Sequence, residues 1–279
     1  MNLAPETRKI LVVWLVLTAI AVPLIVLVLG PHLPPGKMSS EASAQTDANV
    51  VLTALIAPIV LLLAVYFGYS LAVFRARGDQ LEDGPPIQGH GPTQVLWIVV
   101  TSAIVLGLAV WGSDTLIVSA HGAGGGQGPN PDALPANAGQ ALQVQVLGQQ
   151  WNWTYRFPSF GGLETAHLEL PVGEDIELHV TSLDVVHSFW AYQLGVKADA
   201  VPGVDNIAFV HPRRLGNFSI RCSELCGLWH GHMFQTGQVV SAPQFASWIA
   251  LQRHAEAANL KYLPPYARDY FPDPTRRAG

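Results

Sequence analysis

Residues 221–233 read R-C-S-E-L-C-G-L-W-H-G-H-M, and they contain the only two cysteines of the chain, Cys222 and Cys226. His230 follows Cys226 by four residues, and Met233 follows His230 by three. Thiolate, imidazole and thioether groups crowded into one short loop are typical of a copper site. A single-copper electron-transfer site uses only one cysteine, so the second thiol indicates two copper ions bridged by both thiolates.

Two bridged ions need a second histidine, and His187 in the sequence D-V-V-H-S-F (184–189) is the best candidate. A disulfide between Cys222 and Cys226 is the main alternative, because disulfides form in domains that lie outside the cytoplasm. Zinc is the next alternative, since it also binds cysteine and histidine. The histidine four residues and the methionine seven residues after Cys226 favour a metal site over a disulfide. The methionine and an oxidising location favour copper over zinc.

This loop resembles the dinuclear copper (CuA) loop of subunit II of the haem-copper cytochrome c oxidases. The spacing of its cysteine, histidine and methionine residues matches that family, and His187 lies at the family's usual distance before the first cysteine. The segment L-G-V-K-A-D-A-V-P-G (194–203) also matches the family. Several linked motifs within residues 151–240 therefore carry the resemblance. It implies that this part of the chain folds as a cupredoxin-like Greek-key β-barrel.

The resemblance implies a role for each donor group of the site. The two thiolates bridge the copper ions, His187 and His230 each bind one ion, and Met233 is a weak ligand. The main-chain carbonyl of Glu224 supplies the other weak ligand. Each predicted metal ligand offers one sulfur, nitrogen or oxygen atom. The six residues are His187, Cys222, Glu224, Cys226, His230 and Met233. In the family, the carboxylate at the Glu224 position also binds a magnesium or manganese ion shared with subunit I, and Asp199 matches an acid near that ion.

The aromatic run W-N-W-T-Y-R-F (151–157) precedes the copper loop in the sequence. In the family, its first tryptophan lies between the docked donor and the copper centre, so the resemblance implies that Trp151 receives the incoming electron. Trp153 and Tyr155 are expected to anchor the sheet. The family often has His-Gln-Trp-Tyr-Trp here, whereas this chain has Q-Q-W-N-W (149–153). The surface that faces the donor is therefore expected to differ.

The composition indicates membrane spans, because 49% of the residues are hydrophobic and only 13% are charged. Three apolar stretches are long enough to cross a bilayer as helices, at about 10–30, 50–74 and 94–118, and the polar residues 31–49 are expected to form a loop between the first two. Basic residues lie before the first stretch and after the second: Arg8, Lys9, Arg75 and Arg77. By the positive-inside rule, the amino terminus lies inside and the copper loop outside. A cleaved signal peptide is the other interpretation of the first stretch, which is long for one.

Four segments are expected along the chain: transmembrane helices to residue 118, a Gly/Pro-rich linker (119–139), the copper domain (140–242) and a C-terminal part (243–279). Short alternating stretches predict the strands of the copper domain at 141–147, 151–157, 166–170, 175–181, 206–211, 216–221 and 236–240. The C-terminal part is expected to begin with an amphipathic helix and to end in a Pro-rich tail. The apolar face predicted for that helix consists of Phe245, Trp248, Ile249 and Leu251. The fold class is therefore a membrane-anchored α+β protein.

The resemblance implies the electron-transfer subunit of a proton-translocating respiratory cytochrome c oxidase in the cytoplasmic membrane of a bacterium. This subunit takes electrons from cytochrome c or a small copper protein. It passes them to the haem-copper subunit I, which reduces oxygen to water. A net charge of −5 and a pI of about 6.0 exclude nucleic acid as a partner. The alternative is the CuA subunit of a nitric oxide reductase. It stays open because Gln94 stands where the oxidases commonly carry a glutamate of the proton path.

Overall fold

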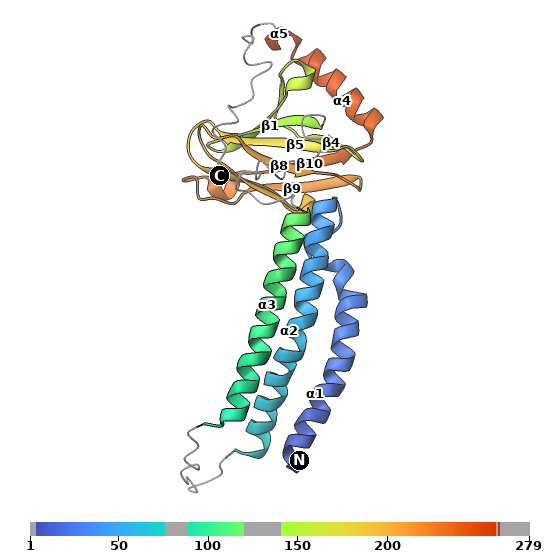
Figure 1. Cartoon of the computed structure of the whole chain (residues 1–279). Helices are drawn as coiled ribbons and strands as arrows, with labels where there is room; N and C mark the ends of the chain where they lie inside the picture. The colour runs from blue at the N-terminus through green and yellow to red at the C-terminus, as the bar shows by residue number, and fades with distance from the viewer. Residues whose placement is uncertain (1–3, 76–88, 120–140, 261, 263–279) are drawn as a thin grey trace. The chain divides into compact units, whose positions relative to one another are not determined.

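The computed structural model describes residues 4–75, 89–119, 141–260 and 262. The chain divides into two compact units, Met1–His32 with Ala48–Ile117 and Leu33–Asp47 with Val118–Gly279. The first unit is helical, and the second contains the β-strands (Figure 1). The linker predicted at 119–139 lies outside the described residues except for its first residue, and so does the predicted C-terminal tail except for residue 262.

The helical unit contains the three predicted spans. Their helices are α1 (Pro5–Leu24), continued by η1 (Ile25–Leu29) and η2 (Gly30–His32), α2 (Ser40–Val73) and α3 (Gly91–Ser119). Each has the length and apolar composition needed to cross a membrane. Many of their large side chains are exposed on the helix surfaces, as expected for groups that face lipid. Two contacts join α1 to α2: the Trp14 indole donates to the Pro58 carbonyl at 2.7 Å, and the Tyr69 hydroxyl contacts the Glu6 carboxylate.

The second helix begins about ten residues before the predicted span, so the polar loop expected over 31–49 is wrong from residue 40 onward. The Ser39 hydroxyl accepts a hydrogen bond from the backbone of Ala42 at 2.9 Å and caps the first turn. Residues 33–47, here called the 33–47 segment, belong to the β unit and not to the helical unit. Their polarity suits this position, because they pack against protein and not against lipid.

The 33–47 segment is joined to the strands of the β unit by one buried and one partly buried hydrogen bond. The Ser39 hydroxyl donates to the Leu194 carbonyl at 2.7 Å, and the Gln45 amide donates to the Gly195 carbonyl at 2.6 Å. Gly195 has a φ of +66°, and a Cβ there would lie 2.8 Å from the backbone of Ala42. Only glycine therefore permits this close approach. The segment is thus a structural part of the domain that follows it much later in the sequence.

The β unit consists of two five-stranded sheets. Its strands are β1 (Leu142–Gln149), β2 (Asn152–Phe157), β3 (Leu163–Thr165), β4 (Glu169–Pro171), β5 (Ile176–Ser182), β6 (His187–Ala191), β7 (Val196–Ala200), β8 (Asn206–Val210), β9 (Gly216–Cys222) and β10 (Phe234–Val240), with short turns η4 (Pro158–Phe160), η5 (Tyr192–Leu194) and η6 (His230–His232). The sheets have the orders β3-β2-β1-β5-β8 and β4-β10-β9-β6-β7. The pairs β1/β5 and β10/β4 are parallel, and the others are antiparallel. The predicted architecture, apolar helices followed by a cupredoxin-like β-domain, is confirmed.

Three strands were not predicted, namely β3, β6 and β7. The burial of β6 explains one of these failures, because four of its five residues are buried and the period-2 alternation of a half-exposed strand is absent. By contrast, β2 alternates strictly between buried and less buried residues, and its position was predicted to within one residue. The centre of the unit holds the large side chains of both sheets, among them Trp153, Tyr155, Phe189 and Phe218.

Helix α4 (Ala242–Ala255) covers part of the β unit and is followed by α5 (Ala257–Leu260). Phe245 and Ile249 are buried and Trp248 is partly buried against the core, as predicted. The prediction is wrong for Leu251, which is 64% exposed. Leu251 follows Phe245 by six residues, which places it about 240° further round the helix and away from the sheet.

A buried polar cluster lies in the first sheet. His179 Nδ1 is 2.8 Å from the Asp205 carboxylate, and His179 Nε2 is 2.5 Å from the amide oxygen of Gln143. The Gln143 amide nitrogen donates to Glu177 at 2.8 Å, which turns its oxygen toward the histidine. An oxygen acceptor thus faces each ring nitrogen of His179. Leaving a buried polar group without its partner costs about 1–3 kcal/mol, so the cluster fixes β5 against the start of β8.

Candidate metal centre

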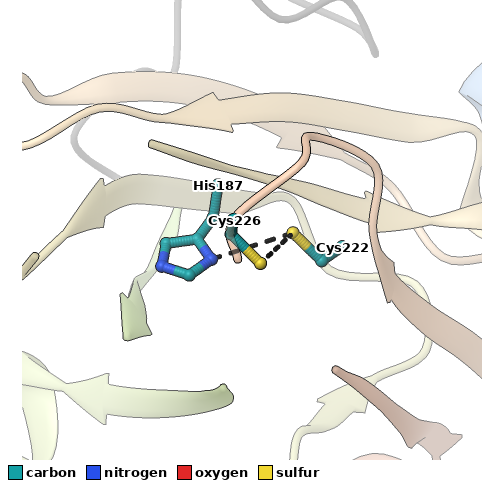
Figure 2. A group of neighbouring side chains, drawn as sticks. All are labelled: His187, Cys222 and Cys226. Atoms are coloured by element: carbon teal, nitrogen blue, oxygen red, sulfur yellow. Dashed lines mark hydrogen bonds between the residues drawn. The ribbon is translucent and has the colours of Figure 1, made fainter. Parts of the chain in front are cut away.

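Strand pairing brings the two cysteine thiols and His187 together. Strand β6 begins at His187 and lies beside β9, with Phe189 opposite Cys222. The loop after β9 then returns Cys226 toward the same point. Figure 2 shows the three side chains converging, and their ligand atoms all lie within 4.8 Å of one another. The Sγ atoms are 3.7 Å apart, and Cys222 Sγ is 3.8 Å from His187 Nδ1.

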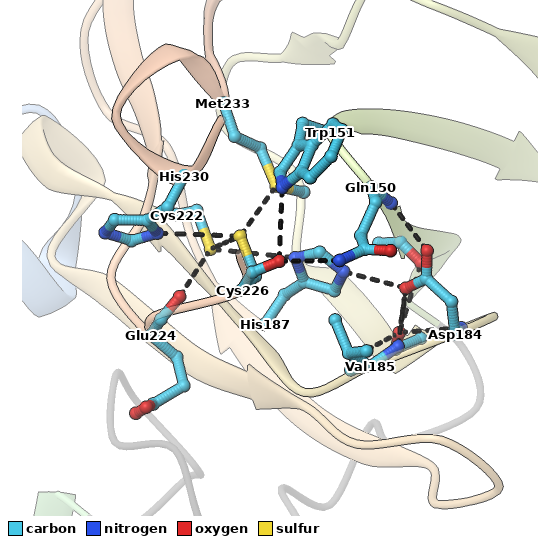
Figure 3. Close-up of polar contacts among 12 residues, drawn as sticks. Gln150, Trp151, Asp184, Val185, His187, Cys222, Glu224, Cys226, His230 and Met233 are labelled. Atoms are coloured by element: carbon cyan, nitrogen blue, oxygen red, sulfur yellow. Dashed lines mark hydrogen bonds and ion pairs between the residues drawn. The ribbon is translucent and has the colours of Figure 1, made fainter. Parts of the chain in front are cut away.

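The remaining predicted ligands surround the same two sulfurs (Figure 3). The Glu224 carbonyl oxygen lies 3.2 Å from Cys222 Sγ. His230 Nδ1 is 3.5 Å from Cys226 Sγ, and Met233 Sδ is 3.8 Å from the same atom. Each sulfur thus has one imidazole nitrogen and one weaker donor beside it. This paired arrangement of soft donors fits two copper ions that share both sulfurs.

The two cysteines are free thiols and are buried. Their Sγ–Sγ distance of 3.7 Å is far longer than the roughly 2.05 Å of a disulfide bond. Burial, together with the neighbouring thiol of Cys222, raises the pKa of the Cys226 thiol to about 12. A pair of thiolates at this distance therefore needs a bound cation to compensate its charge.

Three groups enclose the imidazole of His187, which is fully buried. The Asp184 carboxylate lies 2.9 Å from Nε2, and the Trp153 ring meets the imidazole edge-on with centroids 5.9 Å apart. On another side, a Cβ at Gly148 would lie 3.2 Å from the imidazole, so this position leaves room for the ring. Burial acts against the charge of Asp184, but hydrogen bonds from the backbone of Gln150 and from His187 outweigh it and lower the pKa of the carboxyl.

Trp151 contacts the copper loop through a hydrogen bond. Its indole Nε1–H donates to the Cys226 carbonyl at 3.1 Å, and the Gln150 side-chain amide donates to the same oxygen at 2.8 Å. Gly227, with a φ of +113°, packs against both side chains. Trp153 and Tyr155 are fully buried in the core, as expected for residues that anchor the sheet.

Gln150, Asp184 and Gly148 were not recognised from the sequence. A carboxylate three residues before a candidate histidine was visible in D-V-V-H (184–187), and it is the one available signal. Gln150 contacts Cys226 and Gly148 contacts His187, and these partners are far away in the sequence. No local sequence pattern therefore predicts either contact.

The second metal site expected from the family is not assembled by the described residues. The Glu224 side chain is exposed and points away from the sulfur pair in Figure 3. Asp199 lies on β7 opposite Ser188. Within the described ranges, His187, Cys222 and Cys226 form the single His/Cys/acid group close enough to hold a metal ion. His232 is exposed and lies edge-on to Trp229, with ring centroids 5.1 Å apart.

Comparison with known proteins gives a consistent result. Residues 163–240 match the family model described as cytochrome c oxidase subunit II, periplasmic domain. Cytochrome c oxidase subunit 2 of Thermostichus vulcanus is 28% identical over 300 residues, which cover 92% of this chain and 89% of the relative. The Synechocystis protein of the same name is 26% identical over 285 residues, covering 84% and 85%. The crystal structure of the periplasmic domain of cytochrome oxidase subunit II (CoxB) of Bradyrhizobium japonicum is 32% identical. It covers 41% of this chain and 94% of that domain, with a TM-score of 0.40.

Proposed function

We propose that this chain, a member of the cytochrome c oxidase subunit II family and a subunit of an oxidase complex, holds a dinuclear copper centre on Cys222 and Cys226. This centre receives electrons from a donor protein and passes them to subunit I, where oxygen is reduced to water and protons are pumped. The observation that supports the proposal is the paired donor set: each of two sulfurs 3.7 Å apart has its own imidazole nitrogen and weak donor within 3.8 Å.

Two copper ions held by Cys222 and Cys226 would share one electron, so that reduction would change the metal–ligand bond lengths little. The chain supports this chemistry by holding its donors in place. The backbone of Cys222 donates to the Met233 carbonyl at 3.0 Å, and the backbone of Ser223 donates to the Ser188 carbonyl at 2.9 Å. These bonds tie both ends of the copper loop to strands, and rigid elements keep a site in its working geometry. The burial of both sulfurs and of His187 excludes water from the centre.

The Trp151 side chain connects this centre to the surface of the domain. Trp151 is partly buried, and its indole is hydrogen-bonded to the carbonyl of the ligand Cys226 at 3.1 Å. An electron that reaches the indole therefore crosses one hydrogen bond and then the covalent bonds of a single residue to the sulfur. For this reason we assign electron input to Trp151.

The assembly partners follow from the same proposal. Subunit I accepts the electron, and the donor is cytochrome c or a small copper protein. Glu224 contributes its exposed carboxylate to a magnesium or manganese ion that subunit I completes. The three apolar helices anchor the chain in a bacterial cytoplasmic membrane with the copper domain on the outer face. We infer that α1 is retained, since the Trp14 indole is hydrogen-bonded to α2. The relatives named above are oxidase subunits, so the nitric oxide reductase alternative is not favoured.

The test is to count the copper ions on the purified full-length chain and to record its electron paramagnetic resonance spectrum. Two ions per chain, with hyperfine structure from one electron shared by both copper nuclei, are expected. One copper with a localised spectrum would contradict the proposal. So would a tightly bound zinc ion that copper cannot displace, or oxidation of the two thiols to a disulfide.

Replacing Trp151 by phenylalanine should slow electron input without changing the centre. Phenylalanine lacks the indole N–H, but Gln150 still donates to the Cys226 carbonyl at 2.8 Å. We expect the rate of reduction by the donor to fall roughly tenfold or more, which corresponds to about 1.4 kcal/mol in the barrier. Stopped-flow reduction by cytochrome c measures this rate, and the copper spectrum serves as the control. An altered spectrum would show that Trp151 shapes the site instead.

Replacing Met233 by leucine should leave most of the copper bound, because the two thiolates and two imidazoles remain. The lost thioether lies 3.8 Å from Cys226 Sγ, on the same side as His230. We therefore expect a changed reduction potential in a redox titration and a changed division of the electron between the ions in the resonance spectrum. Met233 is buried, and leucine has a similar volume, so the fold should tolerate the change. Loss of both ions would assign Met233 a structural role.

A further inference from the structure

We infer that Asp184 is the residue that positions His187 for metal binding, holding its imidazole in the tautomer protonated on Nε2, and that it ties this histidine to the Gln150–Trp151 turn. The inference rests on the proposed copper function. Asp184 lies in the loop between β5 and β6, three residues before His187.

The Asp184 carboxylate is occupied by hydrogen bonds within the domain. Its Oδ1 accepts from the backbone of Val185 at 2.6 Å and faces His187 Nε2 at 2.9 Å. Its Oδ2 accepts from the backbone of Gln150 at 2.7 Å. The Ser182 hydroxyl adds a longer contact to Oδ1 at 3.3 Å. Figure 3 shows the carboxylate between the turn of Gln150 and the ring of His187. Asp184 is an exposed residue with 32% of its side chain accessible, but both of its oxygens accept hydrogen bonds from within the domain.

The contact with Asp184 determines which ring nitrogen of His187 carries a lone pair that can bind a metal ion. A carboxylate can only accept, so Nε2 carries the proton in the neutral imidazole. The lone pair is then on Nδ1, and Nδ1 is the nitrogen that lies 3.8 Å from Cys222 Sγ. Metal-binding histidines usually have such a partner on the second nitrogen, which fixes the ring and makes it a stronger donor. Gly148 and the edge of Trp153 restrict the ring on its other sides.

The two histidines of the centre are therefore not equivalent. His187 is fully buried and has a carboxylate on Nε2. His230 is only partly buried, and among the described residues no carboxylate is within ion-pair distance of its ring. Asp184 makes His187 the stronger donor, so positive charge is better stabilised on the side of Cys222 and His187. The shared electron is expected to be divided unequally for this reason.

The same carboxylate connects the ligand to the site of electron input. Asp184 Oδ2 holds the backbone of Gln150, and the side chains of Gln150 and Trp151 hold the Cys226 carbonyl. A single residue thus fixes the ring of one ligand and the turn that contacts another. Loss of Asp184 should disturb both.

The experiment compares Asp184→Ala, which removes the acceptor and the charge, with Asp184→Asn, which keeps one acceptor oxygen and removes the charge. Asp175→Asn is the matched control, because Asp175 pairs with His211 away from the two cysteines. The first readout is made on the metal-free full-length chain labelled with ¹⁵N-histidine. Nuclear magnetic resonance should show His187 as a single Nε2–H tautomer in the wild type and in the control. In Asp184→Ala the Nδ1–H form should appear, and Asp184→Asn should restore the wild-type tautomer at least in part.

The second readout is made after copper loading. We expect the affinity for copper to fall about 10–100-fold in Asp184→Ala. The copper hyperfine pattern should change in both Asp184 variants and stay unchanged in Asp175→Asn. If Asp184→Ala does not fold, the hyperfine pattern and the His187 tautomer of Asp184→Asn decide whether Asp184 positions His187. A wild-type tautomer together with a wild-type spectrum in the folded Asp184 variants would overturn the inference. A wild-type chain that bound no copper would instead overturn the proposed function, and the tautomer measurement on the metal-free chain would still stand.

Discussion

Replacing Cys226 by serine is expected to abolish the two-copper centre and with it electron transfer from the donor to oxygen. Cys226 Sγ is the sulfur next to both His230 Nδ1, at 3.5 Å, and Met233 Sδ, at 3.8 Å. A serine hydroxyl is a hard and weakly acidic donor that cannot replace a bridging thiolate. The purified variant should hold at most one copper ion, with a localised resonance spectrum, and oxidase turnover should fall about a thousandfold or more, equivalent to about 4 kcal/mol.

His232→Ala is the control for this experiment. His232 lies in the same loop but is exposed and outside the donor set, so this variant should bind two copper ions with an unchanged spectrum. Cys222→Ser should behave like Cys226→Ser, because in the proposed centre each sulfur would bind both ions. Two copper ions per chain in either serine variant would show that the thiolates do not bridge.

Replacing Gly237 by alanine should strongly destabilise the β unit. Gly237 on β10 lies opposite Phe218 on β9, and a Cβ there would lie 2.3 Å from the Phe218 ring. Phe218 is buried in the core, so the ring cannot move into solvent to relieve the clash. Overpacking of this kind costs about 1–3 kcal/mol and occasionally more. We expect a loss of about 3 kcal/mol in the free energy of unfolding, measured by urea titration of the full-length chain.

Gly231→Ala is the matched control, because among the described residues, its chain neighbours aside, no atom lies within 4 Å of a Cβ at that position. It should leave the unfolding midpoint nearly unchanged. Combining Gly237→Ala with Phe218→Leu should recover part of the lost stability, since a smaller side chain opposite the new methyl relieves the contact. Equal stability of Gly237→Ala and the wild type would show that β9 and β10 can separate locally at little cost.

The sequence was most informative where the relevant residues are close together in the chain. The spacing of Cys222, Cys226, His230 and Met233 was sufficient to predict a common site, and the structure places their donor atoms around two sulfurs. His187 was chosen because two bridged ions need a second histidine, and the resemblance supported that choice. No local spacing links it to the loop, because its proximity to Cys222 depends on the pairing of β6 with β9. Whether these residues bind copper stays a prediction that the copper count will test.

Tertiary contacts explain what sequence patterns missed. The polar residues 31–49 suggested a loop, but from Ser40 onward they form a helix whose buried Ala42 and Thr46 face protein. Strand β6 lacks alternation because it is buried on both faces. The support of His187 by Gly148 and Asp184 combines residues from β1 and from the loop before β6. No short stretch of sequence contains both Gly148 and Asp184.

The 33–47 segment also has a consequence for the biogenesis of the protein. Ser39 and Gln45 leave the ribosome long before Leu194 and Gly195, the residues whose carbonyls they bond. During synthesis, residues 39–45 are therefore exposed before the strands that they will contact have been made. The β unit completes its fold by packing against a part of the chain that was synthesised earlier. A defect at Ala42 or Gly195 should accordingly appear as failed maturation and loss of the subunit, and not as slow electron transfer in an assembled enzyme.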